Sequence, residues 1–441
     1  MMNRFKTMLL LVLSLAAFLY FRGDGVSIKA PPPPSPRDVG ESPLAAPVPE
    51  LSVVEFEDAL QEAPDLNTYG FCGAQNKPGF KRPGVKISYN LAISRLYKKV
   101  RSGDVDLEDA FETLEEITRT PHQHMEALVL FGLWLRSDRE HRQSHRALIK
   151  ALENEIPASP GLYLKMGTQL THTPHTQWAL RSLQKYLQSF PQDAVISQRA
   201  ARLEVLSQVL EEFILLSEQN INLYVPKALP SHEREELLEW SVDILQEAAD
   251  LLSTSSLPDL TVILFHDRSE LLATSCSPTW ATGRFDGMVK IFSKPGDSHQ
   301  LKEILRHELL HAQLSGLTKT MVPGWFNEGL AQLFAHQTRG GRHHLKRMVE
   351  HELLMPLSSL NGPLSELEQS SDAGFAYSQS RLMVMYAINR QGEGVLAQAI
   401  EYLEAGEPPN ELWQHMTEDE SLLSGGFIDF VARELQGKRG R

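Results

Sequence analysis

The chain has 441 residues, of which 42% are hydrophobic, so it is long and apolar enough to bury the cores of two or three domains. Its net charge is −13, it has no long basic block, and the basic tail 438–441 is short. This balance argues against a nucleic-acid-binding protein, and we expect no nucleic-acid partner.

Residues 1–21 have the pattern of a targeting segment. Arg4 and Lys6 precede an apolar run from Met8 to Phe21, which is shorter than the roughly 20 residues of an untilted membrane span. No small-x-small cleavage site follows, so a cleaved signal peptide and an uncleaved signal anchor both remain open. Because positive charges before the run favour an N-terminus that stays inside, either interpretation predicts export of the bulk of the chain.

A proline-rich linker is predicted at residues 22–50. The run from Ala30 to Pro36 favours extended polyproline geometry, which suits a spacer between a membrane and a domain. The two cysteines, Cys72 and Cys276, could pair in an oxidising compartment or remain unpaired, and neither has the spacing of a metal site.

Residues 51–210 are predicted to form a helical domain, because apolar residues recur at helical spacing from about Val85 onwards. The segment Trp178–Asp193 resembles the second helix of a tetratricopeptide-like (TPR-like) pair, with Pro191 ending it and the next helix at 194–209. No clean repeat of about 34 residues is present. A concave surface for a protein partner and a plain helical domain packed against the rest both remain open.

The pattern of apolar residues changes at about Phe213, and residues 211–441 are predicted to form a second domain. Alternating residues at 220–225 predict a strand, and 232–252 predict a helix. Buried or short strands are expected at 260–265 and 288–292. These strands are expected to form a small sheet, and another helix follows them in the sequence.

That helix contains His307-Glu308-Leu309-Leu310-His311. Two histidines four residues apart lie on one helix face, where both imidazoles can reach one metal ion, and Glu308 can take a proton from water. Asp297 or Ser298 is a plausible N-cap of the helix, and Gly316 a plausible stop.

A catalytic zinc needs a third protein ligand. The metzincin pattern requires Gly and His at positions held here by Leu314 and Leu317, and no Asp occurs between Ser298 and Ser371. Glu328 remains, in a second helix that starts after Pro323-Gly324 and is expected to run to Arg339. His336, Glu350 and Glu352 are the alternative ligands.

The His-Glu-x-x-His motif followed by Trp-Phe-Asn-Glu-Gly-Leu-Ala at 325–331 resembles the gluzincin metallopeptidases, most closely the bacterial peptidase MA-like group. The resemblance implies that His307, His311 and Glu328 bind Zn²⁺ and that Glu308 is the general base in the hydrolysis of a peptide or protein substrate. It also implies an α+β fold, with a gluzincin-like domain of a small mixed sheet and helices after the TPR-like domain. The expected location is the periplasm or outside the cell, with an anchor in the inner membrane.

Other residues near these motifs have two interpretations each. Phe375–Ser380 resembles the family's Tyr-x-Gln-Ser segment, so Tyr377 is either a donor to the oxyanion or an aromatic packed under the site. Asn327 and Gln332 either orient the zinc ligands or are amides on a helix surface. Residues 287–292 are either an edge strand that pairs with substrate or a core strand.

Two functions from different classes follow from these observations. The first is an exported, membrane-tethered zinc endopeptidase. The second is a binding protein, in which the helical domain recruits a partner and the zinc site is structural or inactive. The complete set of two histidines and two glutamates favours the first, because an inactive site often loses its base.

Overall fold

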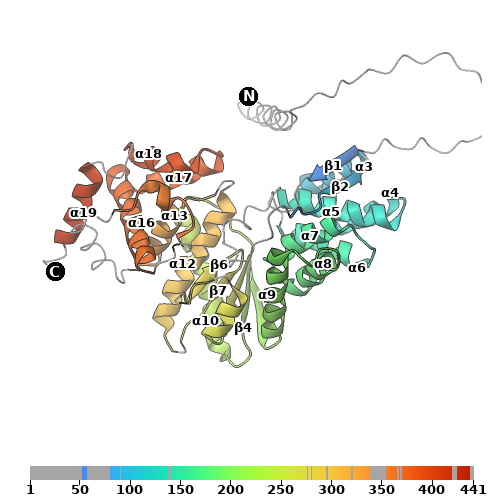
Figure 1. Cartoon of the computed structure of the whole chain (residues 1–441), viewed down its shortest axis with the longest axis horizontal. Coiled ribbons are helices and arrows are strands. Elements are labelled where there is room, and N and C mark those ends of the chain that lie inside the picture. The colour runs from blue at the N-terminus through green and yellow to red at the C-terminus, as the bar shows by residue number, and fades with distance from the viewer. Residues whose placement is uncertain are drawn as a thin grey trace, which may run out of the picture. The chain divides into compact units, whose positions relative to one another are not determined.

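Figure 1 presents a computed structural model, which describes residues 52–56 and 80–437 apart from residues 90, 138–140, 276, 280, 295, 319–320, 338–353, 365–366, 368–369 and 420–424. Helices predominate there, and five strands form one small mixed sheet, so the predicted α+β class is confirmed. The targeting segment, the linker, both cysteines and the basic tail lie outside the described residues. In the part that is described, no helix is both long and apolar enough to cross a membrane.

The N-terminal part begins with a pair of strands, where the sequence pattern predicted helix. β1 (Ser52–Phe56) pairs antiparallel with β2 (Val85–Tyr89). Val85 and Ile87 alternate with polar residues and are buried against the helices, which is a strand period of two. Seven helices follow: α3 (Leu91–Ser102), α4 (Leu107–Ile117), α5 (Pro121–Ser137), α6 (His141–Glu153), α7 (Pro160–Leu170), α8 (Thr176–Ser189) and α9 (Ala194–Leu210).

The helix pair expected around Pro191 is confirmed as α8 and α9. Asp193 caps α9 by accepting a hydrogen bond from the backbone N–H of Ile196 at 3.2 Å. Its buried carboxylate also accepts hydrogen bonds from the Tyr186 hydroxyl at 2.9 Å and from Arg82 Nε at 2.8 Å. One carboxylate thus ties a helix start to two other segments.

The C-terminal part is built on a sheet with the order β3-β4-β5-β7-β6. Its strands are β3 (Phe213–Glu218), β4 (Ile221–Pro226), β5 (Leu260–Leu264), β6 (Gly283–Phe285) and β7 (Val289–Ile291). The three inner strands β4, β5 and β7 are parallel, and β3 and β6 run antiparallel at the two edges. The interpretation of 287–292 as an edge is therefore wrong, because β7 lies between β5 and β6, and β6 is the edge strand.

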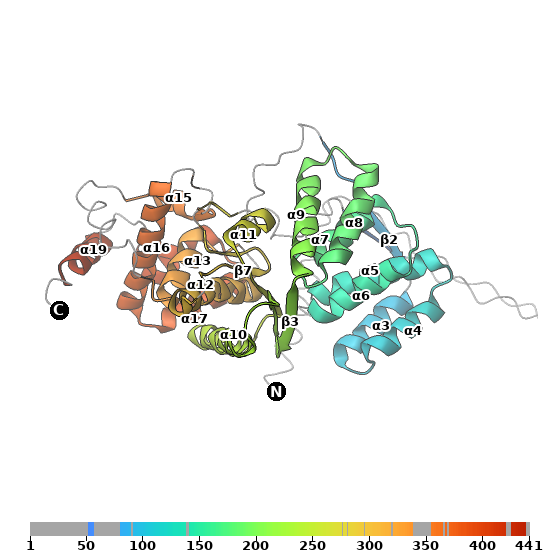
Figure 2. The ribbon, with the colours of Figure 1, turned by 90° about the horizontal axis from the view of Figure 1, so that it is seen from below.

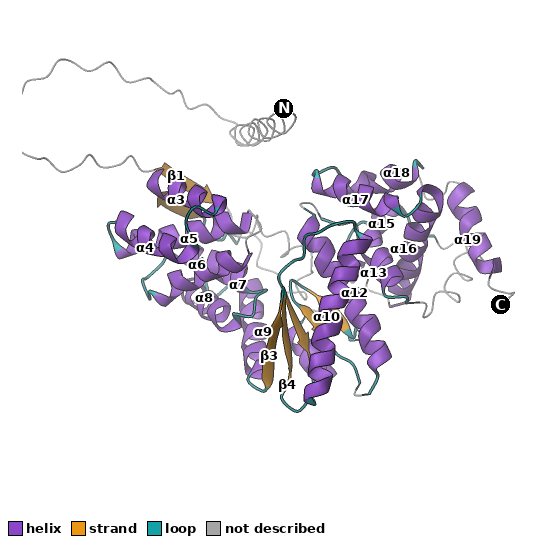
Figure 3. Ribbon diagram, turned by 180° about the vertical axis from the view of Figure 1, so that it is seen from behind, coloured by secondary structure: helices purple, strands orange, loops and turns teal. Residues whose placement is uncertain are grey.

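Alternate residues of the strands point to opposite faces of this sheet. Val262 and Leu264 join the core under α10 (Ser231–Leu251) and α12 (Ser298–Leu317), whereas Ile263 and Phe265 join a smaller cluster under α9 and α11 (Arg268–Thr274). Figures 1 and 3 show α9 and α10 on opposite sides of β4.

The last helix of the N-terminal part, which we call the helical part, therefore has two packing roles. Ile196 and Leu203 of α9 belong to the core of the helical part, and Leu206 belongs to the cluster on the sheet. The predicted boundary after residue 210 coincides with the end of α9, but side-chain packing continues across it.

Of the remaining helices, α13 packs against both α12 and α16, and α17, α18 and α19 pack against α16 (Figure 2). They are α13 (Gly324–Phe334), α15 (Leu357–Leu360), α16 (Ser370–Gln391), α17 (Gly394–Glu404), the 3₁₀ turn η2 (Pro409–Glu411), α18 (Leu412–Thr417) and α19 (Gly425–Gly437). Trp325 and Phe326 are fully buried, as expected for core residues, and the Trp325 ring meets Trp413 edge-on at 5.7 Å.

Two predicted helix ends are wrong. Gly316 lies inside α12, which ends at Leu317, and a methyl group at Gly316 would come within 3.1 Å of Pro258, so this glycine serves close packing. Helix α13 ends at Phe334 rather than at Arg339, because His336 has a φ of 54°, which a right-handed helix cannot contain. Residues 338–353, including Glu350 and Glu352, lie outside the described residues.

Candidate metal centre

Helix α12 presents the two histidines of the motif on one face. Asp297 is its N-cap and accepts a hydrogen bond from the backbone N–H of Gln300 at 3.0 Å, as the sequence predicts. Leu305 and Leu309 bury the adjacent face in the core of the C-terminal part. The spacing of four residues then brings the rings of His307 and His311 to a centroid distance of 4.7 Å.

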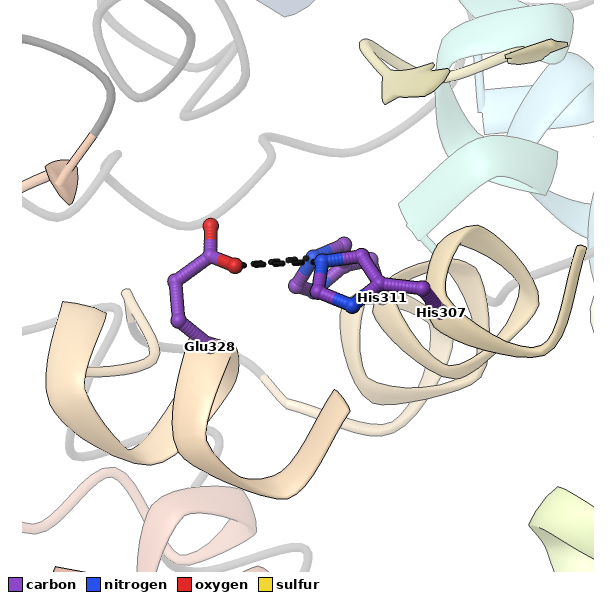
Figure 4. Close-up of side chains that lie close together, drawn as sticks. All are labelled: His307, His311 and Glu328. Atoms are coloured by element: carbon purple, nitrogen blue, oxygen red, sulfur yellow. Dashed lines mark hydrogen bonds and ion pairs between the residues drawn. The ribbon is translucent and has the colours of Figure 1, made fainter. Parts of the chain in front are cut away.

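Helix α13 brings Glu328 to the same point. Pro323 precedes the helix, and Glu328 lies in its second turn, facing α12. In Figure 4 the carboxylate extends from α13 toward both rings. Its Oε2 atom lies 3.2 Å from Nε2 of His307 and 3.4 Å from Nε2 of His311.

These distances suit one tetrahedral ion. Zinc with ligand distances of about 2.0–2.1 Å separates its ligand atoms by about 3.3–3.4 Å. His307, His311 and Glu328 are the group whose ligand atoms converge in this way within the described residues, and His336 is not part of it. Two imidazoles and a carboxylate are also the donor set that a catalytic zinc takes.

His311 and Glu328 shift each other's pKa in opposite directions. Burial alone would raise the pKa of Glu328, but the charge of His311 and hydrogen bonds from both imidazoles hold it well below its usual range. Burial alone would lower the pKa of His311, but the Glu328 carboxylate raises it to about 9. The metal-free group is thus a protonated imidazole paired with a carboxylate, and a cation can replace the proton.

Glu308 lies beside the group, with 6% of its surface exposed. Burial raises the pKa of its carboxyl above the usual range, which makes the carboxylate a stronger base. A methyl group at Gly283 would come within 2.5 Å of Glu308 Oε1, so the edge strand β6 passes directly against this carboxylate.

The two neighbouring amides, Asn327 and Gln332, have different hydrogen-bond partners. Asn327 Oδ1 lies 2.9 Å from His311 Nδ1, so it can hold the tautomer that leaves Nε2 of His311 free for a metal. Gln332 instead donates a hydrogen bond to the Tyr377 carbonyl at 3.1 Å and so ties α13 to α16. Asn327 is therefore placed to orient a ligand, and Gln332 to orient the helix that carries Tyr377.

Tyr377 projects from α16 to the group. Its partly exposed side chain is hydrogen-bonded to the Glu328 carboxylate, and burial followed by the charge of Glu328 raises the pKa of its hydroxyl well above the usual range. The hydroxyl therefore keeps its proton near neutral pH and remains a donor.

The residue that sequence reasoning missed is Gly283. Its only local signal is the short Gly-Arg-Phe-Asp-Gly run, in which two glycines bracket three residues. A three-residue strand has too few positions to display a period of two, so the edge could not be assigned from the pattern.

The chain matches no protein-family model, and no curated protein is significantly similar to it. The functional assignment therefore depends on the geometry of the site and on the resemblance of its motifs.

Proposed function

We propose that this protein is a zinc-dependent peptidase of the gluzincin type, with residues 211–441 as its catalytic domain. The single observation that carries the proposal is the convergence of His307, His311 and Glu328 at 3.2–3.4 Å, with the buried Glu308 beside them. The helical part is proposed to be TPR-like, and the exported, membrane-tethered location is inferred from the sequence of residues 1–21 alone.

The chemistry follows from the charge and protonation of the site residues. A zinc ion held by His307, His311 and Glu328 would supply Lewis acidity toward water and a peptide carbonyl. Glu308 takes a proton from the attacking water and passes it to the leaving amine, a role that its raised pKa favours. The Tyr377 hydroxyl, protonated near neutral pH, donates a hydrogen bond to the oxyanion that forms.

Substrate would bind along β6. Among the described strands, β6 pairs with β7 alone, so an extended peptide that binds beside β6 would continue the sheet. Gly283 brings that strand against Glu308, which would place a bound peptide bond next to the base. The substrate class is therefore an extended segment of polypeptide.

A structural zinc site with no activity is the weaker alternative. A structural site has no use for a buried carboxylate that is not a ligand, since burial of such a charge costs stability. The position of Glu308 thus favours catalysis.

The test is Glu308→Gln, compared with Glu303→Gln on the same helix. Zinc content, measured by plasma emission spectrometry, should stay near one ion per chain in all three proteins. Cleavage of a peptide library should fall by about 10²–10⁴-fold in Glu308→Gln only, because general-base catalysis contributes about that factor. A Glu308→Gln protein that cleaves as fast as the wild type would remove the proposed base, and a zinc-loaded wild type that cleaves nothing would end the proposal.

A further inference from the structure

The loop between α7 and α8 rests on the turn between β6 and β7. Gly287 in that turn has a φ of +95°, and a methyl group added to it would overlap Cβ and Cγ of His172. The imidazole of His172 therefore lies directly against the backbone of the turn, and both the backbone angle and the contact require glycine.

His172 is an unusual residue for this place. Both of its ring nitrogens are buried and make no hydrogen bond, and Oδ1 of Asp286 in the same turn is also buried without a partner. Burial and the neighbouring Arg199 lower the pKa of His172 to about 3, so the ring is neutral at physiological pH. An apolar ring of similar size would fill this space without leaving buried polar atoms unbonded, so stability alone does not account for the histidine.

The turn is held firmly on the side of β7. Lys290 Nζ donates hydrogen bonds to Asp286 Oδ2 at 2.8 Å and to the Thr274 carbonyl at 2.9 Å, and Lys290 is almost fully buried. From the helical part, His172 lies directly against Gly287. Two groups thus hold the turn, the ion pair of Lys290 with Asp286 and the imidazole of His172.

The other end of β6 reaches the candidate active site. Gly283 begins the strand and lies against Glu308, while Gly287 follows the strand and lies against His172. Because β6 is an edge strand with one sheet neighbour, a shift of the turn can move the whole short strand. The helical part is therefore connected to the proposed base through five residues.

We propose that His172 is a positioning residue: it seats the β6–β7 turn and so sets where β6 lies beside Glu308 and the bound substrate. This inference rests on the proposed peptidase function. It gives the helical part a role in catalysis that does not require it to touch the substrate.

The kinetic test compares His172→Ala, His172→Phe and His175→Ala. His175 is in the same loop, at the start of α8, where its side chain makes no capping hydrogen bond, so it controls for damage to the loop. We expect His172→Ala to raise the KM for a peptide substrate about tenfold with kcat within about twofold, because the substrate binds on β6. His172→Phe restores the ring and should restore KM, and His175→Ala should leave KM unchanged.

Hydrogen exchange of the zinc-loaded proteins provides a readout that needs no activity. The amides of 283–291 should exchange faster in His172→Ala than in the wild type, in His172→Phe or in His175→Ala, with equal zinc content throughout. Equal exchange of 283–291 in His172→Ala and His175→Ala would overturn the proposal, as would an unchanged KM in His172→Ala. A wild type that binds zinc but cleaves no peptide would instead overturn the proposed function, and the exchange result would still decide whether His172 holds β6.

Discussion

Two carboxylates, one in each part of the molecule, are surrounded in opposite ways: that of Asp193 is fully buried, and that of Glu328 is 14% exposed. Asp193 in the helical part accepts hydrogen bonds from the guanidinium of Arg82, from a tyrosine hydroxyl and from a backbone N–H. Glu328 in the C-terminal part faces two imidazoles, and a second carboxylate, Glu308, is close enough to influence the same histidines.

The two sites differ in whether the cationic group that faces the carboxylate can lose its positive charge. A guanidinium stays protonated under all ordinary conditions, so Asp193 has a permanent counter-ion and serves structure. An imidazole can lose its proton, although Glu328 raises the pKa of His311 to about 9, so this partner of Glu328 can exchange its proton for a metal ion. The kind of partner, more than burial itself, therefore separates a structural carboxylate from a metal-binding one.

The largest effect on stability is expected for Asp193→Ala. Removing this carboxylate leaves Arg82 charged beside a buried site and breaks the cap of α9, so the free energy of unfolding should fall by about 3–5 kcal/mol. Asp106→Ala, which removes the exposed cap of α4, is the control and should cost about 1 kcal/mol. Chemical denaturation measures both, and equal losses would mean that the contacts to Arg82 and Tyr186 add nothing.

Glu328→Gln should affect zinc affinity strongly and stability only weakly. Zinc affinity should fall by at least about 100-fold, since a charged ligand is lost. The unfolding free energy of the metal-free protein should change much less than in Asp193→Ala, because His311 can release its proton once the carboxylate is gone. Competition with a chelating dye measures the zinc affinity, and denaturation of the metal-free protein measures its free energy of unfolding. Retention of wild-type zinc affinity would refute the role of Glu328.

Asn327→Ala tests a residue beside Glu328 that is placed to orient the zinc ligand His311. Loss of the hydrogen bond to His311 Nδ1 should weaken zinc binding by about 10–100-fold, as is usual for a residue that orients a metal ligand. Gln332→Ala is the matched control, because this amide binds a backbone carbonyl of α16 and no zinc ligand. If both variants lowered zinc affinity equally, the effect would come from disturbance of α13 and not from His311.

The smallest step expected in zinc affinity is the change for each unit of pH. His311 must lose its proton to bind a metal, and its pKa is raised to about 9, so apparent affinity should weaken by up to about tenfold for each pH unit below 9. Affinity should therefore rise with pH and level off as the pH passes this pKa. Competition titrations at pH 6, 7 and 8 would show the slope, and a flat profile would contradict the pairing of His311 with Glu328.

Much of this structure could be predicted from local signals. The N-cap of α12 was predicted at Asp297 or Ser298 and is Asp297, and the spacing of His307 and His311 placed both rings on one face. Elimination of other ligands led to Glu328, which the structure brings to the same point. These inferences depend on residues that are neighbours on one helix or follow a clear break in the chain.

The errors concern features that depend on contacts between distant segments. Gly316 is a residue type that often ends helices, but it lies one residue inside the end of α12, where it leaves room for Pro258. The order of β6 and β7 in the sheet is decided by pairing with β5, which no local pattern of 283–291 reveals. The contact of His172 with Gly287 joins two residues from different parts of the chain, so nothing in either local sequence predicts it.

Anomalous diffraction at the zinc edge, from crystals of the purified protein, would show whether one zinc ion binds between His307, His311 and Glu328. We expect a single strong anomalous peak at about 2.0–2.2 Å from Nε2 of both histidines and from the Glu328 carboxylate. A zinc-loaded crystal with its peak elsewhere, or with the Glu328 carboxylate turned away from the ion, would contradict it.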